Sequence, residues 1–156
     1  MTIQPDGKKC RCGNYGCLET LASADWLVRR AEERLRQGGQ SSLRQDLDRP
    51  GGLDAEHIYR AAMSGDQMAQ DLFHLVGTSL AIAIANVVHL LGLRSVLIGG
   101  GVANGWEAFI GSLCGELERR LTLIPPDEVN VIRAQMGDDA GPLGGGYLAA
   151  KSTGII

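Results

Sequence analysis

The chain has 156 residues, which is enough for one domain with a buried core. Apolar residues make up 44% of it and charged residues 21%, the balance of a soluble globular protein. The net charge of -3, with acids and bases interspersed, argues against a nucleic-acid-binding surface, because such a surface needs a basic patch.

The first residues indicate a strand end, a turn and a tight loop. Residues 2–4 are typical of the end of a strand. Residues 5–7 read Pro-Asp-Gly and predict a turn, since Pro presets φ and Gly accepts positive φ. Residues 10–17 form a tight loop with glycines at Gly13 and Gly16.

Three helices are predicted next. Residues 23–37 have helical spacing and end at a Gly-Gly pair, and the polar residues 40–52 form an exposed connection. Asp54 can cap a short helix, and Asp66 can cap a long central one. The apolar positions of the long helix are Met68, Leu72, Leu75, Val76, Ala83, Val87 and Leu90.

Two short apolar segments then predict strands. Residues 95–98 and 129–132 are rich in β-prone residues and are apolar on both faces, as buried parallel strands should be. Together with the helices they predict half of an α/β architecture. Two strands do not make a self-sufficient sheet, so we expect further strands from sequence outside this segment.

Each predicted strand is followed by a helix. Asn104 can cap the first of these helices, whose inner side carries apolar residues up to Leu121. Asp138 or Asp139 can cap the last helix, and we interpret both as caps rather than magnesium ligands. Pro142 falls in the first turn of that helix, where a missing N–H is harmless.

No targeting or membrane segment stands out. Residues 1–6 contain neither a basic nor an apolar run, so they do not resemble a signal peptide. The longest apolar run, residues 80–91, contains Asn86 and His89 and is too short to span a bilayer. We therefore expect a cytoplasmic protein without a membrane contact.

Three of the four cysteines crowd into one segment with the spacing C-x-C-x4-C. Cytosolic thiols in such a cluster bind metal more often than they pair. Zn²⁺ takes four ligands in a tetrahedron, and Gly13 and Gly16 let the backbone fold around an ion. Cys10, Cys12 and Cys17 therefore indicate three ligands of a structural zinc site; the alternative is a free-thiol loop or a strained disulfide.

The sequence does not identify the fourth ligand. His57, His74 and His89 all fall in predicted helices, where each is more simply a helix residue than a ligand. Cys114 falls on the inner stripe of its helix and is most simply a small core residue. A position upstream of Met1 is thus the remaining candidate.

The cysteine segment resembles the ROK family of sugar kinases and repressors. That family carries a Gly-His pair and then C-x-C-G-x-x-G-C-x-E, and residues 10–19 read Cys-Arg-Cys-Gly-Asn-Tyr-Gly-Cys-Leu-Glu. The resemblance continues through residues 61–66, 96–101 and 137–144, so it covers nearly the whole chain. One departure is at residues 92–93, where Gly-Leu replaces the family's usual Asn-Pro.

The resemblance implies a fold: the C-terminal half of an actin-like, ribonuclease H-like ATPase, with a mixed sheet flanked by helices. It implies a single C-terminal ROK domain over residues 1–156. Within it, the zinc loop takes residues 8–19, a helical region residues 20–92, and a strand-helix-strand-helix nucleotide region residues 93–150.

The resemblance also implies a zinc ligand set and a sugar contact. Zinc is held in the family by the three cysteines and by a His that falls immediately before Met1 here. Glu19 matches the family Glu that hydrogen-bonds hydroxyls of the bound sugar. Without the resemblance, a helix-start acid favoured by the helix dipole is the simpler interpretation of Glu19.

A nucleotide site is implied at the end of the first strand. Gly99, Gly100, Gly101 and Val102 match the family's adenosine pocket, where ATP with Mg²⁺ is the co-substrate. A tight strand-to-helix turn would use the same glycines. The second sugar-binding carboxylate, the phosphate loop and the Asp general base precede this segment in the family, so we assign no catalytic residue.

Three functions fit these observations. The leading one is part of an ATP-dependent kinase of a hexose or N-acetylhexosamine, inactive as an isolated half. The second is the body of a sugar-sensing ROK transcriptional repressor without its DNA-binding domain. The third is a non-catalytic zinc-stabilised interaction module. The expected partners are a small sugar and a second copy of the chain, with the dimer forming through the long helix of residues 66–91. No contact of this segment with nucleic acid or a membrane is expected.

Overall fold

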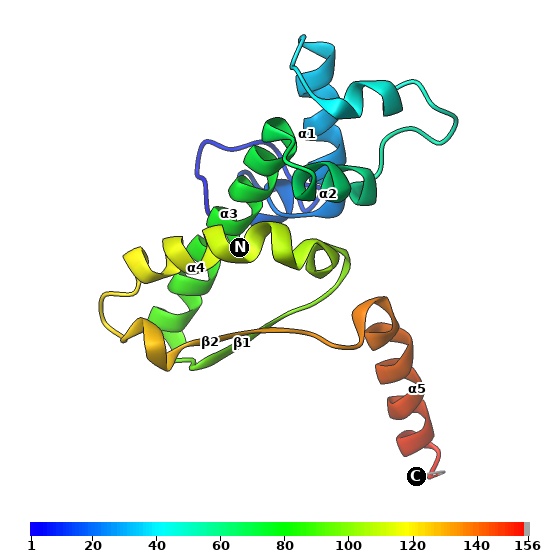
Figure 1. Cartoon of the computed structure of the whole chain (residues 1–156). Helices are drawn as coiled ribbons and strands as arrows, with labels where there is room; N and C mark the ends of the chain where they lie inside the picture. The colour runs from blue at the N-terminus through cyan, green and yellow to red at the C-terminus, as the bar shows by residue number, and fades with distance from the viewer. Residues whose placement is uncertain (155–156) are drawn as a thin grey trace.

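The computed structural model describes residues 1–154, with the side chain of Asp138 left out (Figure 1). Helices dominate the first part, and a small parallel sheet follows the longest helix. The elements are α1 (Ala24–Arg36), α2 (Ala55–Met63), α3 (Gln67–Leu91), β1 (Ser95–Ile98), α4 (Trp106–Arg120), β2 (Asn130–Arg133) and α5 (Ala140–Ser152). The α/β class expected from the sequence is confirmed.

Side chains cap the first three helices. Ser23 accepts a hydrogen bond from the backbone N–H of Trp26 at 3.1 Å. Asp54 and Asp66 accept from first-turn N–H groups of α2 and α3 at 2.7 Å and 3.0 Å. These bonds satisfy N–H groups that have no partner inside the helix. The caps predicted at Asp54 and Asp66 are thus confirmed.

The long helix α3 forms the centre of the core, as its spacing predicts. It packs against α2 on one side and α4 on another. It is also the one helix within residues 1–154 that is long and apolar enough to cross a bilayer, and it extends well beyond the apolar run at residues 80–91. Burial against α2 and α4 accounts for this composition without a membrane.

α3 and α4 approach each other closely at Gly77. A Cβ at this position would lie 2.1 Å from Oγ of Ser112 and 2.6 Å from the carbonyl oxygen of Phe109, both on α4. Phe109 and Leu113 are fully buried beside this contact. The missing side chain of Gly77 therefore lets the two helices pack at a distance that places α4 against the core.

The sheet within the described residues is one parallel pair. β1 and β2 run side by side with Val96 opposite Val131 and Leu97 opposite Ile132. Val96 and Val131 pack against the core, whereas Leu97 is 66% and Ile132 44% exposed. The prediction that both strands are buried on both faces is therefore wrong, because the helices of residues 1–154 cover only one face.

Of three finer predictions for the second part of the chain, those for Asn104 and Cys114 are wrong, and the cap of α5 at Asp138 or Asp139 lies partly outside the described residues. Asn104 does not cap α4, because a 3-10 turn over Gly101–Gly105 runs directly into that helix and places Gly105 at the cap position. Asp139 occupies the cap position of α5 without a side-chain cap bond, and the alternative cap, the Asp138 side chain, lies outside the described part. Cys114 is exposed, because it lies one position away from the buried stripe of α4.

The last helix lies apart from the body. α5 has no buried residue, and Figure 1 shows it extending away from the other helices. Pro142 lies in its first turn, as predicted.

Two glycine variants should separate close packing from helix propensity. We expect Gly77→Ala to lower the free energy of unfolding by about 1–3 kcal/mol, because the new methyl group collides with α4. Gly111→Ala, in α4 with nothing within 4 Å of its Cβ position, should instead raise it by about 0.5–1 kcal/mol. Urea denaturation measures both values, and equal effects would contradict the assigned helix contact.

The carboxylate of Asp66 should make stability depend on acid pH. Besides capping α3, it accepts from Oγ of Ser41 at 2.9 Å and from N and Oγ of Ser42 at 2.7 Å and 2.8 Å. Partial burial opposes ionisation, but hydrogen bonds from Ala69, Ser42 and Ser41 hold the pKa of Asp66 below its ordinary value. A lowered folded pKa stabilises the fold above the unfolded pKa of about 3.9, and this contribution is lost as pH falls through the folded value.

We therefore expect Asp66→Ala to cost about 1–3 kcal/mol at pH 7. The difference from the parent should shrink below about pH 4. Asp71→Ala, an exposed acid on the same helix, is the matched control and should change stability by less than about 0.5 kcal/mol. Denaturation curves at several pH values give the comparison, and a pH-independent difference would count against the hydrogen-bonded carboxylate.

Candidate functional site

The structure brings the three predicted cysteines together. The Sγ atoms of Cys10, Cys12 and Cys17 all lie within 4.8 Å of one another, and those of Cys12 and Cys17 are 3.6 Å apart. Cys10 and Cys17 are buried, whereas Cys12 is exposed. All three are free thiols, so the strained-disulfide alternative is not what the loop adopts.

Two antiparallel contacts form the cysteine loop. Thr2 pairs with Cys17, and Lys9 pairs with Tyr15. Within the loop, the N–H of Cys10 donates to the carbonyl oxygen of Asn14 at 2.7 Å. These bonds turn the chain back on itself, so that cysteines seven residues apart in sequence face one another.

Gly16 is required by this geometry. Its φ is +59°, a conformation that L side chains rarely adopt, and a Cβ there would lie 1.5 Å from the carbonyl oxygen of Gln4. The carbonyl oxygen of Gly16 accepts from the N–H groups of Ile3 and Gln4 at 2.9 Å and 3.2 Å. The first four residues therefore hold the loop closed at Gly16.

The cysteines differ in their electrostatic surroundings. A backbone hydrogen bond from Asn14, and then the thiols of Cys10 and Cys17, lower the pKa of Cys12. Burial raises the pKa of Cys17, and the thiols of Cys12 and Cys10 raise it further. Three thiols this close would repel one another as thiolates unless a cation neutralises them.

The geometry fits a zinc ion. Thiolates bound to tetrahedral Zn²⁺ at about 2.3 Å are about 3.8 Å apart, close to the 3.6 Å between the Sγ atoms of Cys12 and Cys17. Within the described part of the chain, His57, His74, His89 and Cys114 do not join the cluster. The residues of this chain therefore offer three of the four ligands that a structural zinc site needs.

Glu19 follows the cysteine loop directly. It lies in a single 3-10 turn, η1 (Leu18–Thr20), which Thr20 ties to the loop by donating from Oγ1 to the carbonyl oxygen of Cys17 at 2.7 Å. The side chain of Glu19 is exposed and lines a hollow of about 170 Å³ between the loop and α1. Among residues 1–154 it makes no hydrogen bond or ion pair, so it is available to a ligand.

Ion pairs fasten the cysteine loop to α1 beside this hollow. Arg11, between two of the cysteines, pairs with Asp25 in the first turn of α1 at 2.7 Å. Lys8 pairs with Glu33, which lies further along α1, at 3.4 Å. Both pairs are exposed and individually weak, and they connect the loop to the helix.

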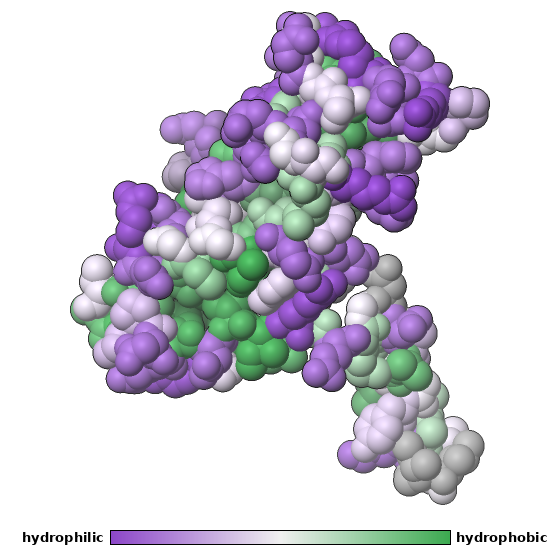
Figure 2. Space-filling model, in the orientation of Figure 1, coloured by the Kyte–Doolittle hydropathy of each residue, from purple (hydrophilic) through white to green (hydrophobic). Residues whose placement is uncertain are grey.

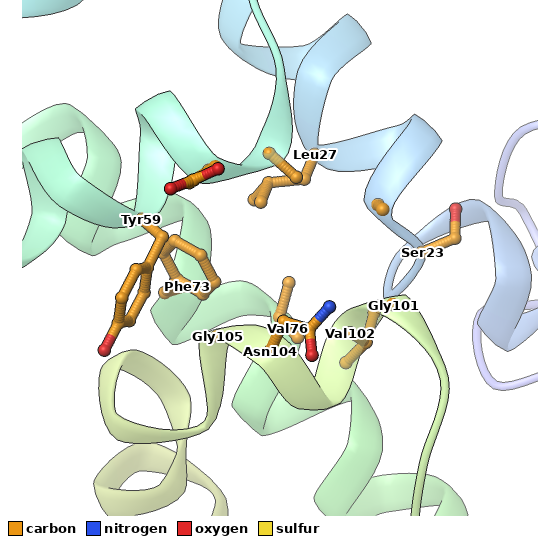
Figure 3. A pocket seen from close by; sticks show the side chains of 12 residues that line it. Ser23, Leu27, Tyr59, Phe73, Val76, Gly101, Val102, Asn104 and Gly105 are labelled. Atoms are coloured by element: carbon orange, nitrogen blue, oxygen red, sulfur yellow. The ribbon is translucent and has the colours of Figure 1, made fainter. Parts of the chain in front are cut away.

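A larger pocket lies between α1, α2, α3 and the turn after β1 (Figure 3). Its volume is about 450 Å³, and its walls are mostly apolar. Of the four residues predicted for a nucleotide site, Gly101 and Val102 line this pocket and Gly99 and Gly100 do not. Figure 3 shows Val102 and Asn104 on this turn, and Val76 of α3, among the side chains that line the pocket.

Sequence reasoning missed the opposite walls of this pocket. Leu27 of α1, Tyr59 of α2 and Phe73 of α3 line it, and the rings of Tyr59 and Phe73 meet edge to face with centroids 6.1 Å apart. The hydroxyl of Tyr59 donates to Glu107 at 3.1 Å, which fixes the ring. These residues have the helical spacing of core positions, so the sequence held no signal that they face a cavity.

The two hollows meet at Ser23. This residue caps α1 and lines both the hollow beside Glu19 and the pocket beside Val102. Only Thr20, Leu21 and Ala22 separate Ser23 from Glu19 in the chain. A ligand on Glu19 and a ligand in the larger pocket would therefore lie on either side of one helix end.

Comparisons with known proteins identify the family of this chain. The model of the ROK family matches residues 1–152. A glucokinase of Halalkalibacterium halodurans is 34% identical over 152 residues, which are 97% of this chain and 46% of that protein. The DNA-binding transcriptional repressor Mlc of Escherichia coli is 37% identical over 97 residues, which are 62% of this chain and 23% of that protein.

A solved structure extends the comparison to the fold. The ROK family glucokinase from Streptomyces griseus, in complex with glucose and AMPPNP, matches with a TM-score of 0.78 and 28% identity, over 95% of this chain and 49% of that one. The chain therefore spans about half the length of the glucokinases it matches. Because the family model spans nearly the whole sequence and relatives match in both sequence and structure, this chain belongs to the ROK family.

Proposed function

We propose that this chain is the part of an ATP-dependent sugar kinase that orients the sugar and holds the nucleotide. The observation that carries the proposal is the shared position of Ser23, which joins the hollow beside Glu19 to the pocket beside Val102. Phosphoryl transfer needs an acceptor hydroxyl and a γ-phosphate held side by side. Relatives named as glucokinases and as an N-acetylmannosamine kinase support a hexose or N-acetylhexosamine as the acceptor.

Zinc has a structural role in this proposal. Cys10, Cys12 and Cys17 would hold the ion, which supplies a cross-link between the two arms of the loop. The histidine of the family pattern would complete the ligand set. Its position is reasonable because the carbonyl oxygen of Met1 accepts from the N–H of Leu18 at 2.9 Å, so a residue bonded to Met1 continues alongside the loop.

Glu19 would bind sugar hydroxyls. A carboxylate accepts from two hydroxyls at once and so fixes the orientation of a ring. Support comes from its exposure in a hollow and from the bond of Thr20 to Cys17, which makes the direction of Glu19 depend on the loop. A rigid loop would therefore aim the carboxylate.

The nucleotide would occupy the larger pocket. Its apolar walls suit a flat base, and Gly101 and Val102 expose backbone at the end of β1. We retain Gly99 and Gly100 as candidates for backbone contacts to the phosphates, because they directly precede the lining residues. ATP would enter with Mg²⁺, whose ligands we do not assign to this chain.

A second function is favoured by one observation, the match to the repressor Mlc. A sugar-sensing repressor body would use the cysteine loop and Glu19 in the same way. It would not need the nucleotide pocket. Nucleotide binding therefore separates the two functions, and in either case we propose a cytoplasmic protein that does not bind nucleic acid through this segment.

We also propose a homodimer that forms through α3. Leu75 is 38% exposed midway along α3, and the exposed Asp71 and the half-buried Thr78 lie one turn to either side of it. A non-catalytic interaction module would use the same surface, but it would not explain the two adjoining hollows.

Replacement of one cysteine should remove the metal. We expect Cys12→Ser to lower zinc affinity on the order of 100-fold or more, because one of the thiolate ligands is lost. Cys12 is exposed, so the core should be unaffected. Metal content by mass spectrometry and competition with a chromophoric chelator measure the effect. Cys114→Ser, the other exposed cysteine, should keep full zinc content, and equal loss in both variants would refute the assigned site.

Ligand binding should distinguish the two functions. Calorimetry should detect binding of glucose and of AMPPNP to the purified chain, without any phosphorylation of glucose when ATP is added, because no general base is assigned to this segment. Val102→Trp should weaken AMPPNP at least about tenfold by filling the pocket. Leu90→Trp, on an 82% exposed residue outside the pocket, is the control. Glucose binding without AMPPNP binding would favour the repressor, and glucose turnover would overturn the assignment of an incomplete enzyme.

A further inference from the structure

Cys12 is the most accessible of the three thiols in the cysteine loop. It is exposed, whereas Cys10 and Cys17 are only 8% and 5% exposed. Figure 2 shows mostly hydrophilic residues over the upper part of the molecule, where Figure 1 draws the first residues of the chain and α1. A small polar reagent dissolved in water therefore reaches the sulfur of Cys12 before it reaches the other two.

A second thiol lies beside this exposed one. The Sγ atoms of Cys12 and Cys17 are 3.6 Å apart, so they are already in contact. A disulfide between them requires this distance to shorten to about 2.05 Å. The structure holds both residues as free thiols and therefore shows the reduced form of the loop.

The two arms of the loop differ in their freedom to make this movement. Gly13, directly after Cys12, has a φ of +91°, and a Cβ there would meet no atom of the described residues within 4 Å. The other arm is held, because Gly16 fits tightly against the first residues and Cys17 pairs with Thr2. The exposed sulfur can thus move toward one whose position is fixed.

We infer that Cys12 is a site of oxidative modification, at which a peroxide reacts and Cys17 then closes a disulfide. The Cys12 thiolate attacks one oxygen of hydrogen peroxide, the O–O bond breaks, and the departing hydroxide takes up a proton to become water. Cys12 is thereby oxidised to a sulfenic acid while the peroxide is reduced. The sulfur of Cys17 then attacks the sulfur of Cys12. The S–S bond forms, the S–O bond breaks, and the hydroxide leaves as water with the proton of the Cys17 thiol.

The disulfide takes two of the three sulfur ligands out of the cluster. Cys10 and one further ligand then cannot retain a zinc ion. Thr20 ties the turn that carries Glu19 to the carbonyl oxygen of Cys17 at 2.7 Å, so this turn loses its metal-stabilised support at the same time. A small thiol reduces the disulfide and restores the site. The oxidation rests on the three thiols alone, and only the release of metal rests on the proposed zinc site.

Peptide mass mapping after peroxide treatment tests the inference. Trypsin cleaves on both sides of residues 10–11 and next after Arg29, so Cys12 and Cys17 share one peptide that excludes Cys10. The metal-free and the zinc-loaded chain are each treated with hydrogen peroxide, at a concentration that leaves Cys114 free to react with an alkylating reagent. The remaining thiols are then alkylated before digestion.

We expect the peptide of residues 12–29 to lose the mass of two hydrogen atoms and to resist alkylation, while Cys10 is alkylated. In the zinc-loaded chain, a chromophoric chelator should register metal release at the rate at which the disulfide forms. A reducing thiol should reverse both changes. Reversal separates a disulfide from oxidation of the thiols to sulfinic or sulfonic acid.

Variants in the metal-free chain separate the two roles. Cys12→Ser should abolish the disulfide and slow the loss of thiols about tenfold or more, because the remaining loop thiols are buried. Cys17→Ser should stop the reaction at a sulfenic acid on Cys12, which dimedone captures. Cys114→Ser, an exposed cysteine that does not join the cluster within the described residues, should leave the disulfide unchanged. Circular dichroism checks the fold of each variant, and the Cys12→Ser result decides if the buried substitution at Cys17 perturbs it.

Two results in the metal-free chain would overturn the inference. The first is full alkylation of both Cys12 and Cys17 after the peroxide treatment. The second is a disulfide that links Cys10 in place of Cys12. A chain that forms the Cys12–Cys17 disulfide but binds no zinc would refute the proposed metal site and support the modification site, so the two failures are distinguishable.

Discussion

The contact between the first four residues and Gly16 is the constraint on which the candidate site depends. The carbonyl oxygen of Gln4 occupies the space that a side chain at Gly16 would need, and the carbonyl of Gly16 accepts from two N–H groups of the opposing arm. These contacts close the loop and bring three thiols within 4.8 Å of one another. In our proposal, zinc then makes the closed loop rigid. Backbone hydrogen bonds that are exposed to solvent would hold the loop less firmly than the metal.

A short stretch of chain, residues 17–25, connects the cysteine loop to the hollow beside Glu19 and to the larger pocket. Thr20 bonds Cys17, Ser23 begins α1, and Arg11 reaches back to Asp25. The hollow beside Glu19 and the larger pocket are therefore built around one helix end rather than on separate, mobile loops. For a phosphoryl transfer enzyme, such an arrangement fixes the relative placement of acceptor and nucleotide at no further cost in ordering.

Local features of this fold could be predicted from the sequence, and tertiary ones could not. Asp54 and Asp66 cap helices because their carboxylates reach N–H groups three residues away, a relation fixed by neighbours in the chain. The cysteine cluster followed from spacing and glycine placement. Leu97 and Ile132 have the composition of buried strand residues, but burial depends on what packs over the sheet, and no local pattern reports that. Phe73 and Tyr59 likewise look like core residues yet line a pocket.

Zinc-edge X-ray absorption on the metal-loaded chain tests most directly whether three thiolates share one ion. We expect a first shell of three sulfur scatterers at about 2.3 Å and one nitrogen or oxygen. A shell with two or fewer sulfur atoms would contradict it, because Cys10, Cys12 and Cys17 would then not act together to hold the loop.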